Sequence, residues 1–558
     1  MPLPMTFPTQ VRPAVGQSLI TKVSRLFNGT ISDVLAELLQ NARRANATAI
    51  YLEVVTDDGS PHLLVRDDGN GIDDPNMLLT LGQSGWGDDT ARREDPAGMG
   101  VFSLAGHAVT VQSYSTTARR AWKVHLPQNG WEGAIALPIE QSDLTRGTLF
   151  DILLPDAWAS QVEQAAKAAA LHYPMPVWLD GEELDRKDFL AGAVYVEHWQ
   201  GCRIGIFADR VTEASHAPRI NFHGVTVPCR LPTVSEVDRQ GWRARVDIID
   251  APALQLVLPA RKEMVENPAL DALRRAVKTA IFRAVSRNAT HRLSFKSWTA
   301  ALDLGIALPE ADAWLSGWLP ITADSRDRYT GDPVRTDPMV IMPAQEAHVE
   351  QALARAFGAQ HPLGGRPVLE EPSFSGYSWY DSLPRAEPCV FTIERDGVQH
   401  AYGADDDLPE DFSTGAVTSI TAEIPVLPDA TEGAEAVVVS IPCEALACTA
   451  WSSDLDDAVI LFVESAPLEP ADFAWFIDAS LFSAADDGDC DSWETQQQDF
   501  SRQSRNLANR LLLGEEAALA ARIRSAFLDH VGWLIPAGRT LALTSSGDGL
   551  AISLAPAA

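Results

Sequence analysis

The stretch LAELLQNARRANATAI at residues 35–50, followed by VRDDGNGI at residues 65–72, decides how the first part of the chain folds. The first stretch belongs to a predicted helix from about Ile31 to Ala45. Glu37 and Asn41 are four residues apart, so a helix places them on one face, one turn from each other. We therefore expect a carboxylate and an amide to act at the same place.

The Glu37 and Asn41 pair has a chemistry that suits a bound phosphate. An amide oxygen at Asn41 can hold Mg²⁺, which prefers hard oxygen ligands, and a carboxylate at Glu37 can orient a water for in-line attack. By itself such a pair is more often an exposed polar stripe on a helix. The pair becomes informative only together with the segments that follow it.

The second stretch ends a predicted hairpin formed by TAIYLEVVTD and HLLVRDDG, with its turn around Asp58 and Gly59. Asp67 stands at the end of the second strand, and Gly69 and Gly71 follow it. A carboxylate next to glycines that admit a flat ligand suits recognition of an adenine amino group. The alternative is a glycine-rich turn with surface acids.

Two further segments complete the set. GMGVFSL at residues 98–104 follows the polar, glycine-containing stretch LGQSGWGDDTARREDPA, which could cover a bound nucleotide. Glycines that open a helix present N–H groups to phosphate oxygens. Gly147 and Thr148 open the strand TLFDILLP, where a hydroxyl could support the Asp67 carboxylate.

In order and spacing, these four segments resemble the GHKL superfamily of ATPases, which have the Bergerat ATP-binding fold. LAELLQNARRANATAI and VRDDGNGI are similar to the MutL mismatch-repair branch, and LGQSG and GMGVFSL are similar to the heat-shock protein 90 branch. LVLPARKEMVENPALDALRRAVKTAI, at residues 256–281, resembles the catalytic-loop segment of the heat-shock protein 90 middle domain. The resemblance covers about residues 20–292.

The resemblance implies roles for single residues. It makes Glu37 the general base, Asn41 the Mg²⁺ ligand and Asp67 the adenine-reading carboxylate, and it implies that ATP and Mg²⁺ are the ligands. Lys262 would contact the γ-phosphate, with Arg261 as the neighbouring candidate. The remaining implied ATP-binding residues are Arg44 near the nucleoside, Gly69, Gly71 and Ile72 at the base, Ser84 and Gly85 at the lid, Gly98, Met99, Gly100, Val101 and Phe102 at the phosphates, and Thr148 beside Asp67.

The chain also departs from the family pattern. Arg44 stands where both branches usually have an acid, and Asp95 replaces a glycine that often opens the phosphate loop. The lid contains Arg92 and Arg93 but no lysine. These departures predict slow turnover rather than a loss of the Glu37, Asn41 and Asp67 set.

The predicted fold class is multidomain α+β. We expect an N-terminal Bergerat-type α/β sandwich, with helices over a mixed β-sheet, at residues 1–190 and an α/β transducer-like middle domain at residues 191–300. A linker at 301–337 and an acidic α+β domain of unknown function at 338–558 would follow. Expected elements include helices that begin near Val162 and Pro268 and at about Glu515, and strands near Val390–Arg395, Ala436–Ile441 and Ala458–Val463.

Charge is distributed unevenly along the 558 residues. From residue 331 to the end there are 37 acidic residues and 11 arginines, so this part carries −26 of the total net charge of −32. Such a surface repels nucleic acid, because binding to phosphates depends on lysine and arginine. The sequence shows neither a membrane span nor a leader, so we expect a cytoplasmic protein, and its six cysteines form no C-x-x-C pair.

Three functions remain within this architecture. The favoured one is a chaperone-like clamp that hydrolyses ATP with Mg²⁺, forms a nucleotide-dependent homodimer and acts on protein clients. The alternatives are a MutL- or MORC-like clamp on DNA, and a nucleotide-sensing interaction protein with slow hydrolysis. A sensor histidine kinase is disfavoured, because none of the 36 residues before Glu37 is a histidine.

Overall fold

The computed structural model divides into two compact units, Met1–Ala311 and Asp312–Ala558. The residues that it describes are 30–78, 80, 100–132, 136–210, 219–237, 240–257, 263–325, 327–358, 361–403, 412–448, 455, 457–485, 491–546 and 549–556.

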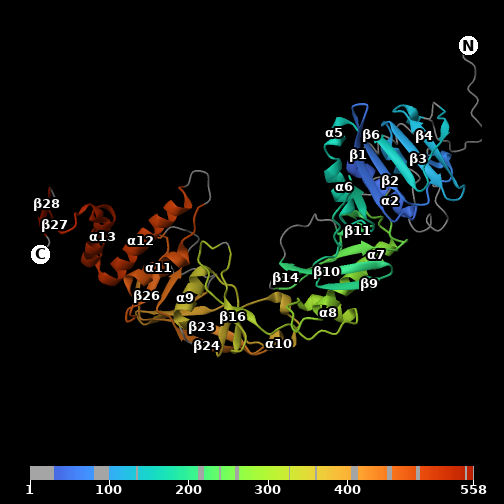
Figure 1. Cartoon of the computed structure of the whole chain (residues 1–558). Coiled ribbons are helices and arrows are strands. Elements are labelled where there is room, and N and C mark those ends of the chain that lie inside the picture. Colours follow the sequence, from blue (N-terminus) through green and yellow to red (C-terminus); the bar gives the residue numbers. More distant parts are fainter. Residues whose placement is uncertain are drawn as a thin grey trace, which may run out of the picture. The chain divides into compact units, whose positions relative to one another are not determined.

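The N-terminal domain is built on one mixed sheet of eight strands, in the order β5-β4-β3-β6-β2-β1-β7-β8 (Figure 1). β1 and β7 are parallel, and the other neighbours are antiparallel. The expected mixed sheet is therefore confirmed. The elements are α2 (Ile31–Arg44), β1 (Ile50–Asp57), β2 (Ser60–Asp67), α3 (Pro75–Leu78), η1 (Gly100–Leu104), β3 (Val109–Ser115), β4 (Arg120–Leu126), η2 (Gly130–Glu132), β5 (Ile139–Gln141), β6 (Thr148–Leu153), α5 (Asp156–Ala159), α6 (Val162–Ala170), β7 (Val177–Leu179) and β8 (Glu182–Glu183).

The β1–β2 hairpin forms where the sequence predicts it. Asp58 and Gly59 make the turn with φ values of 45° and 78°, the left-handed region that a two-residue hairpin turn requires. The register pairs Ile50 with Asp67. The turn thus fixes which residue ends β2, and it brings the Asp67 backbone beside the start of β1.

The core of this domain lies between the sheet and the helices α2 and α6, whose apolar sides are buried. Ile31, Val34, Leu35 and Leu38 of α2 enter the core, and η1 packs against the same helix. Thr30 caps α2 and exchanges hydrogen bonds with Asp33, which satisfies the first backbone N–H groups. Buried apolar residues at helical spacing therefore fix the face that α2 presents outward.

The middle domain is a second, six-stranded sheet in the order β12-β11-β14-β10-β9, with β13 paired to β14. Helix α7 packs on β9, β10 and β14. Pro268 is the first residue of α7, as the sequence predicts, and Asn267 caps the helix. The elements are β9 (Tyr195–Trp199), β10 (Cys202–Arg210), β11 (Ile220–Phe222), β12 (Val225–Val227), β13 (Val234–Ser235), β14 (Gln240–Ile248), α7 (Pro268–Val285) and α8 (Phe295–Asp303).

The C-terminal unit is also α+β, with its main sheet in the order β16-β15-β18-β17-β19-β23-β20-β21 and β24 paired to β23. A smaller sheet, β22-β26-β25, joins the same core. The elements are β15 (Leu315–Gly317), β16 (Gly331–Val334), β17 (Met339–Met342), α9 (Ala347–Phe357), β18 (Arg366–Leu369), η3 (Pro372–Phe374), α10 (Ser378–Asp381), β19 (Arg385–Ala386), β20 (Val390–Arg395), β21 (Val398–Gly403), β22 (Gly415–Val417), β23 (Ser419–Leu427), β24 (Val437–Pro442), β25 (Ala445–Cys448), β26 (Val459–Val463), α11 (Pro470–Leu481), α12 (Trp493–Leu513), α13 (Glu515–His530), η4 (Gly532–Leu534), β27 (Arg539–Ser546) and β28 (Gly549–Pro556).

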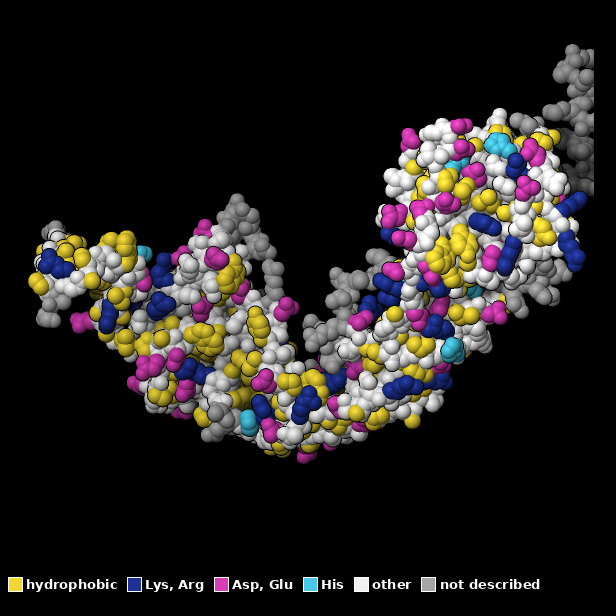
Figure 2. Space-filling model, viewed as in Figure 1, with side chains coloured by type: hydrophobic (Ala, Val, Ile, Leu, Met, Phe, Trp, Pro, Cys, Tyr) yellow, Lys and Arg dark blue, Asp and Glu magenta, His cyan; other side chains and the backbone are white. Residues whose placement is uncertain are grey.

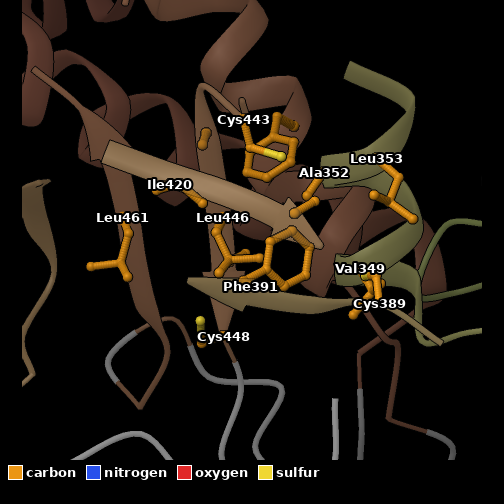
Figure 3. Close-up of a cluster of buried hydrophobic side chains, with 14 of the residues drawn as sticks. Val349, Ala352, Leu353, Cys389, Phe391, Ile420, Cys443, Leu446, Cys448 and Leu461 are labelled. Carbon is orange, nitrogen blue, oxygen red and sulfur yellow. The ribbon is translucent and has the colours of Figure 1, made fainter. Parts of the chain in front are cut away.

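Cysteines contribute to this core as ordinary small apolar side chains. Cys389, Cys443 and Cys448 lie among Val349, Phe391 and other buried residues (Figure 3). Burial raises the pKa of each of the three thiols to about 12. These thiols are therefore protonated and inert at neutral pH.

Residues 301–337 are predicted to form a linker, but the described residues of this stretch contribute to α8, β15 and β16. α8 ends at Asp303, and β15 and β16 lie at the edge of the main C-terminal sheet. Leu315, Trp318 and Val334 are buried. The prolines of this stretch suggest a linker, but its buried apolar side chains pack against residues that are distant in the sequence.

The end of the chain exposes apolar side chains. α13, η4, β27 and β28 contain no buried residue among those described, and β27 and β28 pair only with each other. Figure 2 shows hydrophobic side chains over this segment, and those that are largely exposed include Leu519, Ile523, Leu528, Trp533, Leu534 and Ile552. Within the described part of the chain, no helix combines the length and the apolar character needed to cross a membrane.

Candidate nucleotide-binding site

Helix α2 holds Glu37 and Asn41 on the side that does not enter the core. Both residues are half-buried, and the Oε2 atom of Glu37 is shielded from water. Tyr173 donates a hydrogen bond to the Leu39 carbonyl, which fixes the helix between the two polar residues. The predicted pair is thus carried by a rigid, well-packed helix.

Arg44 lies beside this pair and is itself buried. Its guanidinium donates to Asn41 Oδ1 at 3.3 Å. An amide oxygen has two lone pairs, so this hydrogen bond leaves one acceptor position for a cation. The residue that departs from the family pattern therefore acts directly on the expected Mg²⁺ ligand.

Asp67, at the end of β2, is a buried carboxylate with only 8% of its surface exposed. Burial raises its pKa to about 6, although backbone N–H groups of Gly69 and Thr148 oppose the rise. The Gly69 hydrogen bond to Oδ1 measures 2.8 Å. No described cation lies within ion-pair distance of Asp67, so its charge is stabilised only in part.

Asp68, the next residue, behaves differently. Slight burial favours a higher pKa for Asp68, but hydrogen bonds from Thr48 and Ala49 and the charge of Arg146 outweigh it and hold the pKa below its ordinary value. Asp68 thus ties the end of β2 to the residues just before β1. Of the two adjacent acids, Asp67 is the one suited to a ligand.

A second layer of polar residues supports Asp67. The Thr148 and Ser113 hydroxyls lie 3.0 Å apart, and both residues are buried. Ser113 Oγ also accepts from the Ile72 backbone N–H at 2.8 Å. Thr148 therefore supports Asp67 through its backbone, while its side chain joins Ser113 and holds the Ile72 loop.

Ser113 is a site residue that the sequence analysis missed. A signal was present, because Val109, Val111, Ser113 and Ser115 alternate along β3 and all four are buried. A polar residue in a buried, alternating position calls for a hydrogen-bond partner. That partner, Thr148, is 35 positions away in the chain and could not be identified from β3 alone.

The glycines of VRDDGNGI are required by the packing. Gly71 has a φ of 73°, and a Cβ at this position would lie 1.9 Å from the Tyr114 carbonyl oxygen. At Gly69 a Cβ would lie 2.8 Å from the Ala45 Cβ. The loop after Asp67 therefore lies directly against the end of α2 and against β3, as close approach to a flat ligand also requires.

The phosphate-binding segment is described only in part. Gly100, Val101 and Phe102 begin η1, a short 3₁₀ helix in place of the expected helix. Phe102 is buried, and the centroid of its ring lies 6.0 Å from that of Trp131. The predictions for Ser84, Gly85, Gly98 and Met99 lie outside the described residues, as do those for Arg92, Arg93, Asp95, Arg261 and Lys262.

The helix that carries Glu37 and Asn41 is joined to the middle domain. Gln40 is buried, and its Nε2 donates to the His223 carbonyl in the β11–β12 turn at 2.6 Å. Beside this contact is a cavity of about 280 Å³, lined by Arg43, Phe222, His223 and residues 248–251. Gln40 could not be identified as a site residue from the sequence, since its partner is 183 positions away.

Comparison with known proteins agrees with this geometry at the level of the superfamily. Residues 30–142 match the family described as histidine kinase-, DNA gyrase B- and HSP90-like ATPase. Together with the mixed sheet and its helices, this match defines the N-terminal domain as a GHKL-like ATPase domain. The matched family includes several branches, so neither the heat-shock protein 90 branch nor the MutL branch is singled out.

Two solved structures illustrate how distant the similar proteins are. The ATPase and transducer domains of DNA topoisomerase II from Balamuthia mandrillaris are 12% identical over 46% of this chain and 84% of that one, with a TM-score of 0.34. The ATPase region of Saccharomyces cerevisiae topoisomerase II is 9% identical over 46% and 86%, with a TM-score of 0.32. Similarity at this level assigns neither a function nor a partner. No curated protein matches the chain.

Proposed function

We propose that the N-terminal domain binds ATP with Mg²⁺ and hydrolyses it. The observation that carries this proposal is Asp67, a buried carboxylate whose raised pKa reflects incomplete compensation by the protein. An adenine amino group that donated to Asp67 would supply the missing partner. Gly69, Gly71 and Ile72 would line the base, with Thr148 and Ser113 behind them.

Glu37 and Asn41 would act at the phosphates of the nucleotide. Asn41 Oδ1 is an oxygen ligand of the kind that Mg²⁺ prefers, and a bound Mg²⁺ would neutralise phosphate charge. Glu37 would hold a water and accept its proton. Gly98, Met99, Gly100, Val101 and Phe102 would surround the phosphates, and Ser84 and Gly85 would belong to the lid. Arg44 occupies one acceptor position of Asn41 Oδ1 and places a positive charge beside the expected Mg²⁺, which favours slow hydrolysis.

A direct test of the pocket is the substitution Asp67→Asn. It removes the negative acceptor that adenine needs and presents an amide N–H in its place, so we expect loss of ATP binding by at least about 100-fold. The measurement is calorimetric titration of the full chain with ATP and Mg²⁺. Asp58→Asn, in the β1–β2 turn, is the matched control, because asparagine accepts its positive φ. Unchanged affinity in Asp67→Asn would refute the pocket.

Lys262 is proposed as the cation that contacts the γ-phosphate. Its described neighbours include a β-bridge between Leu256 and Met264, and Val257 donates to the Glu263 carbonyl at 2.8 Å, so the two ends of its segment are close together. An ammonium there would neutralise charge that is absent in ADP. Lys262→Ala should therefore slow turnover while ADP affinity stays unchanged. Normal turnover would move the role to Arg261 or elsewhere.

We further propose that nucleotide binding drives a homodimeric clamp whose clients are proteins, as in chaperones. The net charge of −26 after residue 330 favours a protein client over DNA. The exposed apolar side chains of α13, η4, β27 and β28 suit a second copy of the chain, because a lone two-stranded hairpin is marginally stable in water. Sedimentation with and without ATP tests the dimer, and a duplex-DNA shift tests the alternative clamp on DNA.

A further inference from the structure

The C-terminal unit contains a cavity of about 470 Å³. It lies between the loop at residues 322–329 and the helices α11 and α12. Most of its lining side chains are acids or aromatics. The acids are Asp324, Asp327 and Asp478, and the aromatics are Tyr329, Trp475, Phe482 and Trp493.

Three of the aromatic side chains that line this cavity are exposed to solvent. Trp475 is 62% exposed, Trp493 is 46% exposed and Tyr329 is 78% exposed. Exposed apolar side chains that lie together and are bordered by polar residues mark interaction sites. Trp475 and Asp478 are three residues apart on α11, so helical geometry places the ring and the carboxylate on one face.

The walls of the cavity are held in place by hydrogen bonds. Asp324 accepts from the Trp493 indole N–H and from the Ala484 backbone N–H, the latter at 3.1 Å. The Phe482 ring meets the Trp493 ring edge to face at 5.9 Å. Arg328, in the same loop, donates two hydrogen bonds of 2.9 and 2.6 Å to the Glu350 carboxylate. The loop and the first turn of α12 are thus fixed relative to α11.

The charge of the lining residues determines which class of ligand this cavity can bind. Asp324, Asp327 and Asp478 line it, no described lining residue is basic, and the chain from 401 to 500 has no lysine or arginine. Asp478 is half-buried, and burial raises its pKa although Ser501 donates to it. A bound cation would offset the electrostatic cost of burying the Asp478 carboxylate, and aromatic faces attract cations as well.

We propose that this cavity binds an arginine side chain of a partner protein. A guanidinium is planar, so it can lie against the exposed tryptophan rings while its N–H groups donate to the aspartates. Charge complementarity favours a basic protein segment over any acidic or nucleic-acid ligand. The inference concerns the C-terminal unit alone and holds whether or not the N-terminal domain hydrolyses ATP.

The test is fluorescence anisotropy of a labelled peptide, with three arginines between glycine–serine spacers, titrated with the full chain without nucleotide. We expect Trp475→Ala to weaken binding about fivefold, and Asp478→Asn to weaken it to a similar extent, about fivefold. Trp475→Phe should retain most of the affinity. Asp396→Asn and Val437→Ala, exposed and outside the cavity, are the matched controls.

A peptide with citrulline in place of arginine has the same shape without the charge, and it should bind at least about tenfold more weakly. Non-specific attraction to the acidic unit would give equal binding to the wild type, Trp475→Ala and Asp478→Asn, and that result would overturn the site. Binding of spermidine without binding of the peptide would overturn the proposed partner. Asp67→Asn should leave peptide affinity unchanged, which separates this proposal from the ATP site.

Discussion

The end of β2 in the N-terminal unit and the start of α9 in the C-terminal unit each bury a carboxylate, and the protein compensates the two in different ways. Glu350 has a fully buried side chain, and Arg328 meets it with two hydrogen bonds of 2.9 and 2.6 Å. The backbone N–H groups of Ile321 and Gln345 also donate to it. Asp67 receives backbone hydrogen bonds, but burial still raises its pKa to about 6.

This difference separates a structural acid from a candidate ligand-binding acid. A buried charge that is paired and hydrogen-bonded on all sides has no remaining demand for a ligand, and removing one partner is costly. A buried charge that the protein stabilises only in part gains when a ligand supplies the missing donor. We therefore expect substitutions at the two sites to affect different properties.

The largest expected effect comes from Glu37 of α2, the predicted general base. Glu37→Ala should lower ATP turnover by about 10²- to 10⁴-fold and leave ATP affinity nearly unchanged, because a general base acts on the reaction and not on ground-state binding. Steady-state turnover and calorimetry measure the two properties. Glu53→Ala, an exposed glutamate on β1, is the control. Equal turnover in Glu37→Ala and the wild type would exclude Glu37 as the base.

Glu350 should show the opposite pattern, with a loss of stability and no change at the nucleotide. Glu350→Ala leaves the Arg328 guanidinium and two backbone N–H groups without their acceptor, which should cost about 3 kcal/mol of unfolding free energy in the C-terminal unit. Hydrogen exchange of α9 and β17 locates the loss. Glu346→Ala, exposed at the start of the same helix, should change little. If Glu350→Ala were as stable as Glu346→Ala, Glu350 would not have the structural role proposed for it.

The smallest effect is a pH dependence that belongs to Asp67 alone. With a folded pKa of about 6 against an ordinary value of 3.8, Asp67 binds more protons in the folded state between these values. Its contribution to stability is therefore most favourable below about pH 4, and it is lost as pH rises through about 6. Binding of an adenine amino group needs the ionised carboxylate, so affinity should rise as pH rises, while the contribution of Asp67 to stability falls.

Adenosine is the probe for this dependence, because it carries no phosphate that titrates. At pH 5 about a tenth of Asp67 is ionised, so adenosine affinity should fall about tenfold between pH 7 and pH 5. Chemical denaturation should show that Asp67 raises the unfolding free energy of the N-terminal unit as pH falls from 7 to 5. Asp67→Asn should remove that increase. Adenosine affinity that stays flat with pH would mean that the carboxylate does not contact the base.

Much of the local structure followed from the sequence by itself. The helix expected at Ile31–Ala45 is α2, the hairpin turns at Asp58 and Gly59, and α7 begins at Pro268. In the acidic part, the strand expected at Val390–Arg395 is β20 and the helix expected from Glu515 is α13. Caps, turn residues and apolar periodicity act over a few positions, so the sequence displays them directly.

The sequence also determined which segments meet at the candidate site, because their order resembled a known superfamily. Asp67, Gly71, Ile72 and Thr148 do come together around the end of β2. Their roles toward ATP stay predictions. Lys262, Ser84, Gly85, Gly98 and Met99 stay predictions too, since they lie outside the described residues.

Only the tertiary structure decided the contacts that give these residues their properties. The Ser113–Thr148 pair, the Gln40 contact with His223 and the closing of the acidic cavity by Asp324 and Trp493 join residues 35, 183 and 169 positions apart. A local pattern can show that a polar side chain will be buried, but not which group will meet it. Because compensation of a buried charge depends on that distant partner, the sequence located Asp67, and the fold alone determined that its carboxylate is compensated only in part.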